Sequence, residues 1–145
     1  MKAKSAFSNT DAWPAEGTRG RGKPFRVLIV DDSAAVAAQI RNLLTAEGFQ
    51  IAGAASDGQE GLEKYQKLYP AVDLVMMDIT MPKMDGVTAL GEILKFDKNA
   101  KVIMISALGK QEEVKRSLLI GAKGYIDKPL ERKKVLDRVL RVLKA

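Results

Sequence analysis

The sequence predicts an α/β protein with a doubly wound parallel sheet, and three observations indicate it. Short apolar runs alternate along the chain with longer segments whose apolar residues return at helical spacing. This alternation repeats from position 26 to position 143. Most of the apolar runs lead directly into a charged or hydroxyl side chain. Strands that alternate with helices imply crossover connections and therefore parallel pairing.

Each expected strand is a short run that is mostly apolar, as in strands covered on both faces. The second run is made of small residues, and the third stops abruptly at Asp78. In chain order the expected strands are 27–30, 50–55, 73–77, 101–105 and 123–127.

Each expected helix carries apolar residues on one side. The first ends before Gly48, the second before Pro70 and the fourth before Gly121, which are residues that stop helices. In chain order the expected helices are 33–47, 59–69, 86–96, 110–120 and 131–143.

Right-handed crossovers leave few orders for five parallel strands. The flavodoxin-like order 2-1-3-4-5 fits the count and makes the first and third strands neighbours. Ligands of such sheets bind outside the carboxyl ends of the strands, at the point where strand order reverses. The predicted fold class is therefore α/β, a flavodoxin-like (βα)5 doubly wound parallel sheet.

Four of the expected strands lead to chemically useful side chains at their carboxyl ends, whereas the second strand ends without an obvious group. In strand order these side chains are Asp31 and Asp32, Asp78, Ser106, and Lys128. Adjacent strands lie about 5 Å apart, so the three carboxylates are expected to converge.

Three carboxylates in one crevice repel each other unless a cation joins them. The chain has no cysteine and no histidine, so a metal here must be held by oxygen. Oxygen ligands at an open site suit Mg²⁺, which often bridges to a phosphate. Lys128 offers a point charge for a phosphoryl oxygen, and the Ser106 hydroxyl can donate to the same oxygen.

Each of these residues also has an explanation that involves no ligand. Asp32 or Ser33 can cap the first helix. Ser106 can be a turn residue, and Lys128 can belong to a loop before the last helix. Their joint occurrence at correctly ordered strand ends favours a site.

Composition narrows the class of protein. The 145 residues suit one domain. The lack of cysteine excludes disulfides and thiolate nucleophiles, and the lack of histidine removes the commonest general base. No apolar run approaches the ~20 residues that span a bilayer, and the N-terminus lacks the apolar core of a signal peptide. A cytoplasmic protein without membrane association is expected.

Two segments carry much of the positive charge of the chain, whose formal net charge is +6. Residues 1–24 show no sustained period and are expected to form a flexible basic tail, which leaves 25–145 as the domain. The other basic segment is the last helix, 131–143. It has no zinc-finger spacing or aromatic RNA-binding signature, so no nucleic-acid partner is expected. A solvated face and a surface for an acidic protein partner both remain.

The set of motifs resembles the receiver domain of bacterial two-component response regulators. The resemblance extends from Arg26 to Leu143 and is specific only for the motifs taken together. They are the acidic pair in VLIVDDS, Asp78 in DLVMMDITMPKMDG, Ser106 in KVIMISALG, and Lys128 in GYIDKP.

This resemblance implies roles for the acidic residues. Asp78 would accept a phosphoryl group from a phosphohistidine of a sensor histidine kinase. Asp32 and Asp78 would bind Mg²⁺ directly, and Asp31 would act largely through water. The backbone carbonyl of Thr80 would be the third protein ligand. A receiver is not a classical enzyme, since it catalyses only its own phosphorylation and dephosphorylation.

The resemblance also implies a switch. Ser106 and Lys128 would bind the phosphoryl oxygens, and the peptide bond between Lys128 and Pro129 would be cis. Ser106 would move toward the phosphoryl group, and Tyr125 would rotate into the space it leaves; otherwise Tyr125 is packed permanently at the sheet edge. The surface of the fourth helix, fifth strand and fifth helix would change for a partner.

The sequence defines less closely which partner the protein acts on and in which signalling process. The run SALGKQ and the single-domain layout resemble stand-alone chemotaxis regulators of the CheY type, which bind the flagellar motor switch protein. A phosphorelay intermediate or a receiver domain of a larger regulator would share the same site. A phosphatase is a further partner of such proteins.

Other classes of protein fit the side chains at the strand ends less well. A flavin- or nucleotide-binding module needs a phosphate-cradling loop after the first strand, where Asp31 and Asp32 would repel phosphate without a metal. An aspartate-dependent phosphatase needs a DxD arrangement there, whereas the best nucleophile here, Asp78, follows the third strand. A receiver that never becomes phosphorylated is disfavoured because all five expected side chains are present.

Overall fold

The computed structural model describes residue 17 and residues 23–145. The strands are β1 (Arg26–Val30), β2 (Gln50–Ala55), β3 (Leu74–Asp78), β4 (Val102–Ser106) and β5 (Gly124–Asp127). The helices are α1 (Ala34–Thr45), α2 (Gly58–Leu68), α3 (Gly86–Phe96), α4 (Gln111–Ile120) and α5 (Arg132–Leu143). All pairings are parallel and the order is β2-β1-β3-β4-β5, so the predicted fold class and strand order are confirmed.

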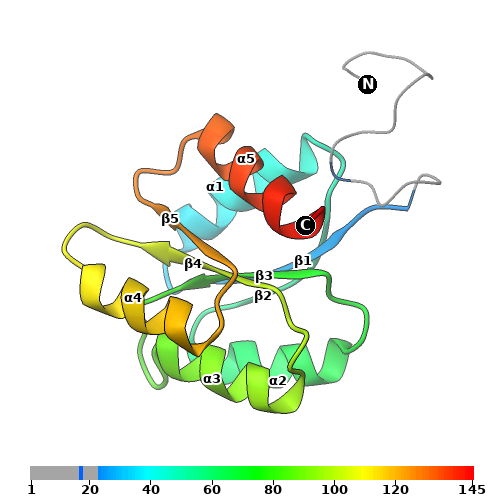
Figure 1. Ribbon diagram of the computed structural model, residues 1–145. Coiled ribbons are helices and arrows are strands. Elements are labelled where there is room, and N and C mark those ends of the chain that lie inside the picture. The colour runs from blue at the N-terminus through cyan, green and yellow to red at the C-terminus, as the bar shows by residue number, and fades with distance from the viewer. Residues whose placement is uncertain (1–16, 18–22) are drawn as a thin grey trace, which may run out of the picture.

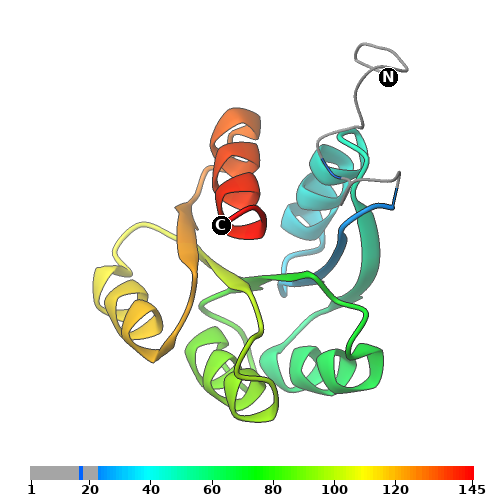
Figure 2. The same ribbon diagram turned by 45° about the vertical axis from the view of Figure 1, so that its right-hand side comes forward.

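The sheet lies between two layers of helices (Figure 1). Helices α1 and α5 cover one face, and α2, α3 and α4 cover the other, as Figure 2 shows. Because every strand runs in the same direction, the loops that follow β1, β3, β4 and β5 all leave the sheet on the same side, at the carboxyl ends of the strands.

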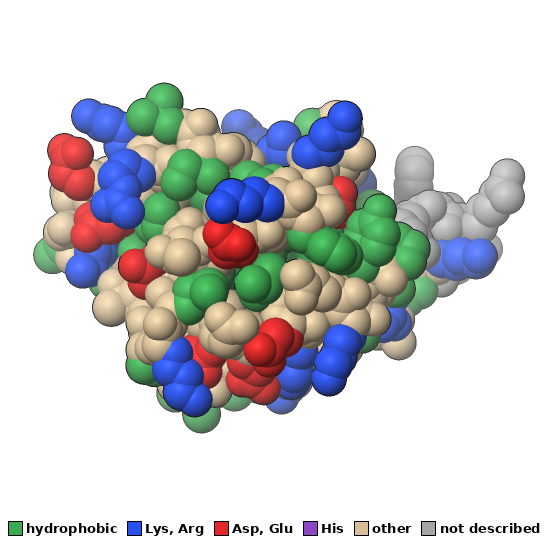
Figure 3. All heavy atoms as spheres, turned by 90° about the horizontal axis from the view of Figure 1, so that it is seen from below, with side chains coloured by type: hydrophobic (Ala, Val, Ile, Leu, Met, Phe, Trp, Pro, Cys, Tyr) green, Lys and Arg blue, Asp and Glu red, His purple; other side chains and the backbone are tan. Residues whose placement is uncertain are grey.

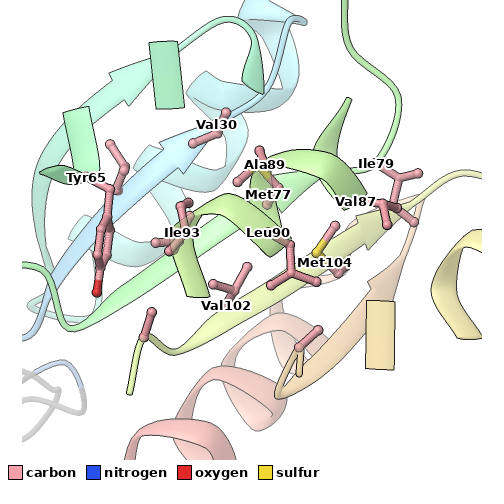
Figure 4. Packing of buried hydrophobic residues seen from close by; sticks show 14 of the residues in the cluster. Val30, Tyr65, Met77, Ile79, Val87, Ala89, Leu90, Ile93, Val102 and Met104 are labelled. Atoms are coloured by element: carbon pink, nitrogen blue, oxygen red, sulfur yellow. The ribbon is translucent and has the colours of Figure 1, made fainter. Parts of the chain in front are cut away.

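Each face of the sheet packs its own hydrophobic cluster, because successive side chains of a strand point to opposite faces. In β1, Leu28 and Val30 join the cluster beneath α2 and α3, which Figure 4 shows from close by. Val27 and Ile29 join the cluster beneath α1 and α5. The strands β3 and β4 are buried throughout, so the residues at their carboxyl ends are held on a rigid support.

The ends of β3 and β4 differ from the prediction by one residue. The sequence predicts that these strands stop before Asp78 and Ser106, but both residues remain in the sheet. Asp78 pairs with Ile105, and Ser106 pairs with Asp127. The apolar pattern ends one residue early because backbone pairing does not require an apolar side chain.

The predicted tail, residues 1–24, lies outside the described residues except at positions 17, 23 and 24. Gly17 is buried against the domain. Its N–H donates to the carbonyl of Glu47 at 2.7 Å, and its carbonyl accepts from the amide of Phe25 at 2.7 Å. Among the described helices, none has both the length and the hydropathy that a membrane span requires.

Candidate functional site

Asp78 ends β3 at the centre of the sheet, and only 5% of it is exposed. The loop after it folds back at once, since the amide of Gly86 donates to the carbonyl of Ile79 at 2.7 Å. A Cβ atom at Gly86 would collide with the carbonyl oxygen of Asp78. The close return of the chain therefore requires glycine and fixes the backbone beside this carboxylate.

Asp31 and Asp32 follow β1 and join Asp78 in one cluster, with carboxylate oxygens all within 4.8 Å of one another. Asp31 is buried, and its Oδ1 accepts from the amide of Ser33 at 2.8 Å. Asp31 Oδ2 is buried without a hydrogen-bond partner among the described residues. Ser33 caps α1 by accepting from the amide of Val36 at 3.2 Å, which leaves the exposed Asp32 side chain available to the cluster.

Burial and mutual repulsion disfavour the ionised forms of these acids. The pKa of Asp78 is raised to about 6, first by burial and then by the neighbouring charge of Asp31, while Lys128 acts in the opposite direction. The pKa of Asp31 is raised mainly by burial. A carboxylate cluster with a buried, unpaired oxygen fits a hard divalent cation such as Mg²⁺, which prefers oxygen ligands.

Lys128 and Ser106 complete the site from the neighbouring strands. Lys128 Nζ lies 3.6 Å from Oδ1 of Asp78, and the peptide bond between Lys128 and Pro129 is cis, as predicted. Ser106 is buried, and its Oγ donates to the carbonyl of Ala107 at 3.0 Å. The structure thus brings Asp31, Asp32, Asp78 and Lys128 together, with Ser106 at the end of β4, the strand next to β3.

The remaining predicted residues are more exposed. Thr80 is exposed, two residues after Asp78. Tyr125 of β5 is 37% exposed and borders a pocket of about 240 Å³ that Arg138 and Lys134 of α5 also line. Tyr125 is therefore accessible in this structure and is not enclosed at the sheet edge.

The end of β2 also contributes a side chain near this site, which was not expected from the sequence. Asp57, two residues after β2, is buried and caps α2 by accepting from the amide of Glu60 at 2.8 Å. Its Oδ2 lies 3.9 Å from Nζ of Lys83, in the loop that follows Asp78. An Asp followed by Glu three residues later is an N-cap signal that could have identified Asp57.

Gly58 also contacts the loop that follows Asp78. Its N–H donates to the carbonyl of Met84 at 2.9 Å, and a Cβ atom at position 58 would collide with that carbonyl oxygen. Together with the contact between Asp57 and Lys83, this bond ties the start of α2 to the loop between Asp78 and α3. The second half of the loop is thus held against the start of α2.

Comparisons with known proteins agree with this geometry. Residues 27–140 match the family model described as the response regulator receiver domain. A chemotaxis protein CheY from Treponema pallidum is 58% identical over 144 residues, which cover 99% of this chain and 100% of the relative. A chemotaxis protein CheY from Thermotoga maritima is 44% identical over 119 residues, or 82% of this chain and 98% of the relative.

A solved structure is similar as well. It is the CheX–CheY–BeF3–Mg complex from Borrelia burgdorferi, with a TM-score of 0.84 and 55% sequence identity. The match covers 87% of this chain and 95% of that chain. The matched relatives are thus spanned almost completely.

Proposed function

Because the chain belongs to the family of response regulator receiver domains and is a CheY-like chemotaxis response regulator, we propose that it signals by accepting a phosphoryl group on Asp78. The donor is a phosphohistidine of a sensor histidine kinase. A carboxylate oxygen of Asp78 attacks phosphorus, the bond from phosphorus to the donor imidazole nitrogen breaks, and that nitrogen keeps the electron pair. The product is an acyl phosphate on Asp78.

The observation that carries this proposal is the environment of the Asp78 carboxylate. Lys128 Nζ lies 3.6 Å from one of its oxygens, and Asp31 and Asp32 form an acidic cluster with it. Phosphoryl transfer needs mainly positioning and neutralisation of charge, and both features contribute. Lys128 would bind a phosphoryl oxygen, and Ser106 would donate to another by turning away from the Ala107 carbonyl.

The same cluster is the proposed Mg²⁺ site. Asp32 and Asp78 would hold the ion directly, Asp31 would hold it largely through water, and the backbone carbonyl of Thr80 would be a further ligand. When bound, Mg²⁺ supplies positive charge that offsets the negative charge of the phosphoryl oxygens. The buried Oδ2 of Asp31, which has no hydrogen-bond partner in the described part of the chain, supports this assignment.

The proposed output surface consists of α4, β5 and α5. Phosphorylation adds negative charge and acceptor oxygens, which would draw Ser106 inward and let Tyr125 follow. This surface already exposes apolar side chains, since Leu119 is 81% and Tyr125 37% exposed. Such side chains suit a protein partner, and we propose the flagellar motor switch protein.

Other partners are consistent with the same site. The Borrelia burgdorferi structure contains CheX bound to a CheY that is 55% identical, so a CheX-like protein is a second proposed partner. A phosphatase is also expected for a protein whose signal must be switched off. On the side viewed in Figure 3, acidic and basic side chains are mixed, which gives no support for nucleic-acid binding.

A phosphorelay intermediate and the receiver domain of a larger regulator remain the alternative functions, because both would use Asp78 in the same way. The surface of α4 and β5 favours output by direct binding, since a relay protein needs only its donor and acceptor. A binding assay with purified motor switch protein, before and after phosphorylation, separates these alternatives.

The phosphorylation itself is tested by intact mass spectrometry after incubation with acetyl phosphate. We expect one phosphoryl adduct that requires Mg²⁺ and is absent in Asp78→Asn. Asp137→Asn is the matched control, because Asp137 is exposed on α5 and pairs with Arg141 outside the site. An adduct that persists in Asp78→Asn would show that the acceptor is another residue.

A further inference from the structure

A pocket of about 320 Å³ lies between helix α5 and the amino ends of β4 and β5. Lys101 and Lys123 immediately precede β4 and β5, and the helix contributes further side chains. Of the six described residues that line the pocket, four are cationic and none is acidic. They are Lys101, Lys123, Arg138, Arg141, Val142 and Ala145.

The backbone and the packing of the sheet hold two of these cations in place. The amide of Lys123 donates to the carbonyl of Val102 at 2.9 Å, which joins Lys123 to the start of β4. The stem of Arg138 lies against Gly124 of β5, where an added Cβ atom would meet Arg138 Cδ at 2.9 Å. Gly124 therefore leaves room for the Arg138 stem, and a side chain that is already packed loses less freedom when it binds a ligand.

The positive charge of this pocket is only partly compensated within the described part of the chain. Arg141 Nε lies 3.1 Å from Oδ2 of Asp137, but both side chains are mostly exposed, and such surface pairs are weak. The ammonium group of Lys101 contacts a neutral carbonyl of α5 at 3.5 Å. The side chains of Lys123 and Arg138 have no hydrogen-bond or ion-pair partner among the described residues. Like charges around one hollow repel each other and attract an anion that joins them.

The size of the pocket and the types of side chain indicate the class of anion. Small-molecule sites measure about 300–1,000 Å³, so this pocket suits a compact ligand. Guanidinium groups bind two phosphate oxygens at once, and ammonium groups act as point charges toward phosphate. One phosphate group carries roughly two negative charges at neutral pH, so two such groups match the cationic side chains better than one.

We propose that this pocket binds a small free anion that carries two or more phosphate groups. It lies where β4 and β5 begin, whereas Asp78 ends β3 and Lys128 follows β5. The site is therefore separate from the acidic cluster, and it requires neither Mg²⁺ nor phosphorylation. A compact hollow favours such an anion over the extended acidic segment of a protein partner.

Isothermal titration calorimetry with inorganic pyrophosphate in metal-free buffer tests the proposal. It is done at about 0.15 M salt, where long-range attraction is screened. We expect saturable binding of one pyrophosphate per chain. Arg138→Gln and Lys123→Gln should each weaken binding on the order of tenfold or more, because each removes a charged hydrogen-bond donor. Arg138→Lys should restore part of the affinity.

Lys133→Gln is the matched control, because Lys133 is an exposed residue of the same helix and does not line the pocket. It removes the same charge and should bind pyrophosphate as the wild type does. Circular dichroism establishes that each variant is folded. If Arg138→Gln does not fold, Lys123→Gln decides, since Lys123 is exposed and its side chain has no partner in the described structure.

Three results would overturn the proposal. The first is no saturable binding of pyrophosphate. The second is equal weakening in Lys133→Gln, which would show a general attraction to the basic helix. The third is binding that survives Arg138→Gln and Lys123→Gln but is lost in Lys128→Ala, which would place the anion at the acidic cluster. Asp78→Asn should bind pyrophosphate like the wild type, so a failure of the phosphorylation proposal leaves this test intact.

Two further titrations distinguish a free anion from larger sources of negative charge. Phosphatidylglycerol vesicles offer phosphate in lipid headgroups, and a polyglutamate peptide offers an acidic protein segment. We expect pyrophosphate to bind more tightly than either and to displace both. Vesicle or peptide binding that depends on Arg138 and resists excess pyrophosphate would assign the pocket to that partner and refute the free anion.

Discussion

Lys128 Nζ lies 3.6 Å from Oδ1 of Asp78, although the two residues come from the ends of β5 and β3 and are separated in the sheet by β4. The ammonium group thus reaches the proposed phosphoryl acceptor from a strand that is not its neighbour in the sheet, and its charge also acts on Asp31. This relationship makes Lys128 the main source of positive charge that the chain itself provides to Asp78.

Replacing Lys128 should slow phosphorylation without unfolding the protein. We expect Lys128→Ala to lower the rate of adduct formation with acetyl phosphate on the order of 10²-fold, as for loss of one charge-stabilising donor in other active sites. The rate is followed by intact mass spectrometry. Lys134→Ala is the control, since Lys134 is an exposed residue of α5 that pairs with Glu131. Equal rates in the two variants would remove Lys128 from the proposed mechanism.

The crowded carboxylates should destabilise the metal-free fold. We expect Asp78→Asn to raise the free energy of unfolding in EDTA by about 1–3 kcal/mol at pH 7.5, because it removes a buried charge beside two others. Mg²⁺ should stabilise the wild type by about 2.7 kcal/mol at a hundredfold excess over Kd. The Asp78→Asn variant should gain much less stability from Mg²⁺. Urea unfolding with and without Mg²⁺ measures both effects, and a variant that is less stable in EDTA would contradict the assigned repulsion.

The hydrogen bond that joins the start of α2 to the loop after Asp78 should be sensitive to the addition of one methyl group at Gly58. Gly58→Ala places a Cβ atom against the carbonyl oxygen of Met84. We expect it to cost about 1–3 kcal/mol of stability by overpacking, and to slow phosphorylation by displacing the loop. Gly91→Ala, in an open position of α3, should instead be neutral or stabilising by up to about 1 kcal/mol. Similar thermal denaturation curves for the two variants would show that the loop adapts freely.

Leu108 should make the acyl phosphate long-lived. It lies two residues after Ser106, is 95% exposed, and has no group that can orient an attacking water. We expect Leu108→Glu to accelerate loss of the phosphoryl group, because a carboxylate can hydrogen-bond that water. Decay of the phosphorylated protein is followed by mass spectrometry after removal of the donor. Identical decay in wild type and variant would exclude this role, and Leu108→Met serves as the apolar control.

Leu119 should contribute to partner binding and little to stability. It is 81% exposed on α4, so Leu119→Asp removes apolar contact area from the proposed output surface without opening a cavity. We expect weaker binding of the phosphorylated protein to the motor switch protein, with a change in unfolding free energy within about 0.5 kcal/mol. Leu119→Met should bind normally. Unchanged affinity in Leu119→Asp would move the binding surface away from this part of α4.

The sequence by itself determined the fold and the side chains that stand at the carboxyl ends of the strands. Alternating apolar runs and helical periods predicted every strand and helix within a few residues, because β1, β3 and β4 are buried on both faces and leave an unmistakable pattern. Because the strands are parallel, Asp31, Asp78 and Ser106 then had to lie on the same side of the sheet, at the carboxyl ends of the strands. Side-chain chemistry at the strand ends was sufficient to propose them as a site.

Only the tertiary structure decided how these residues are paired and restrained. It assigned the cap of α1 to Ser33 and not to Asp32, and it directed the Ser106 hydroxyl to the Ala107 carbonyl. It also revealed that Oδ2 of Asp31 is buried without a hydrogen-bond partner within residues 17 and 23–145. The choice between two neighbouring capping residues and the direction of one hydroxyl depend on differences of a few tenths of an ångström in the folded chain. Other contacts join segments far apart in the sequence, which no local pattern encodes. The same reason explains why the bond between Gly58 and Met84 and the attachment of Gly17 could not be foreseen.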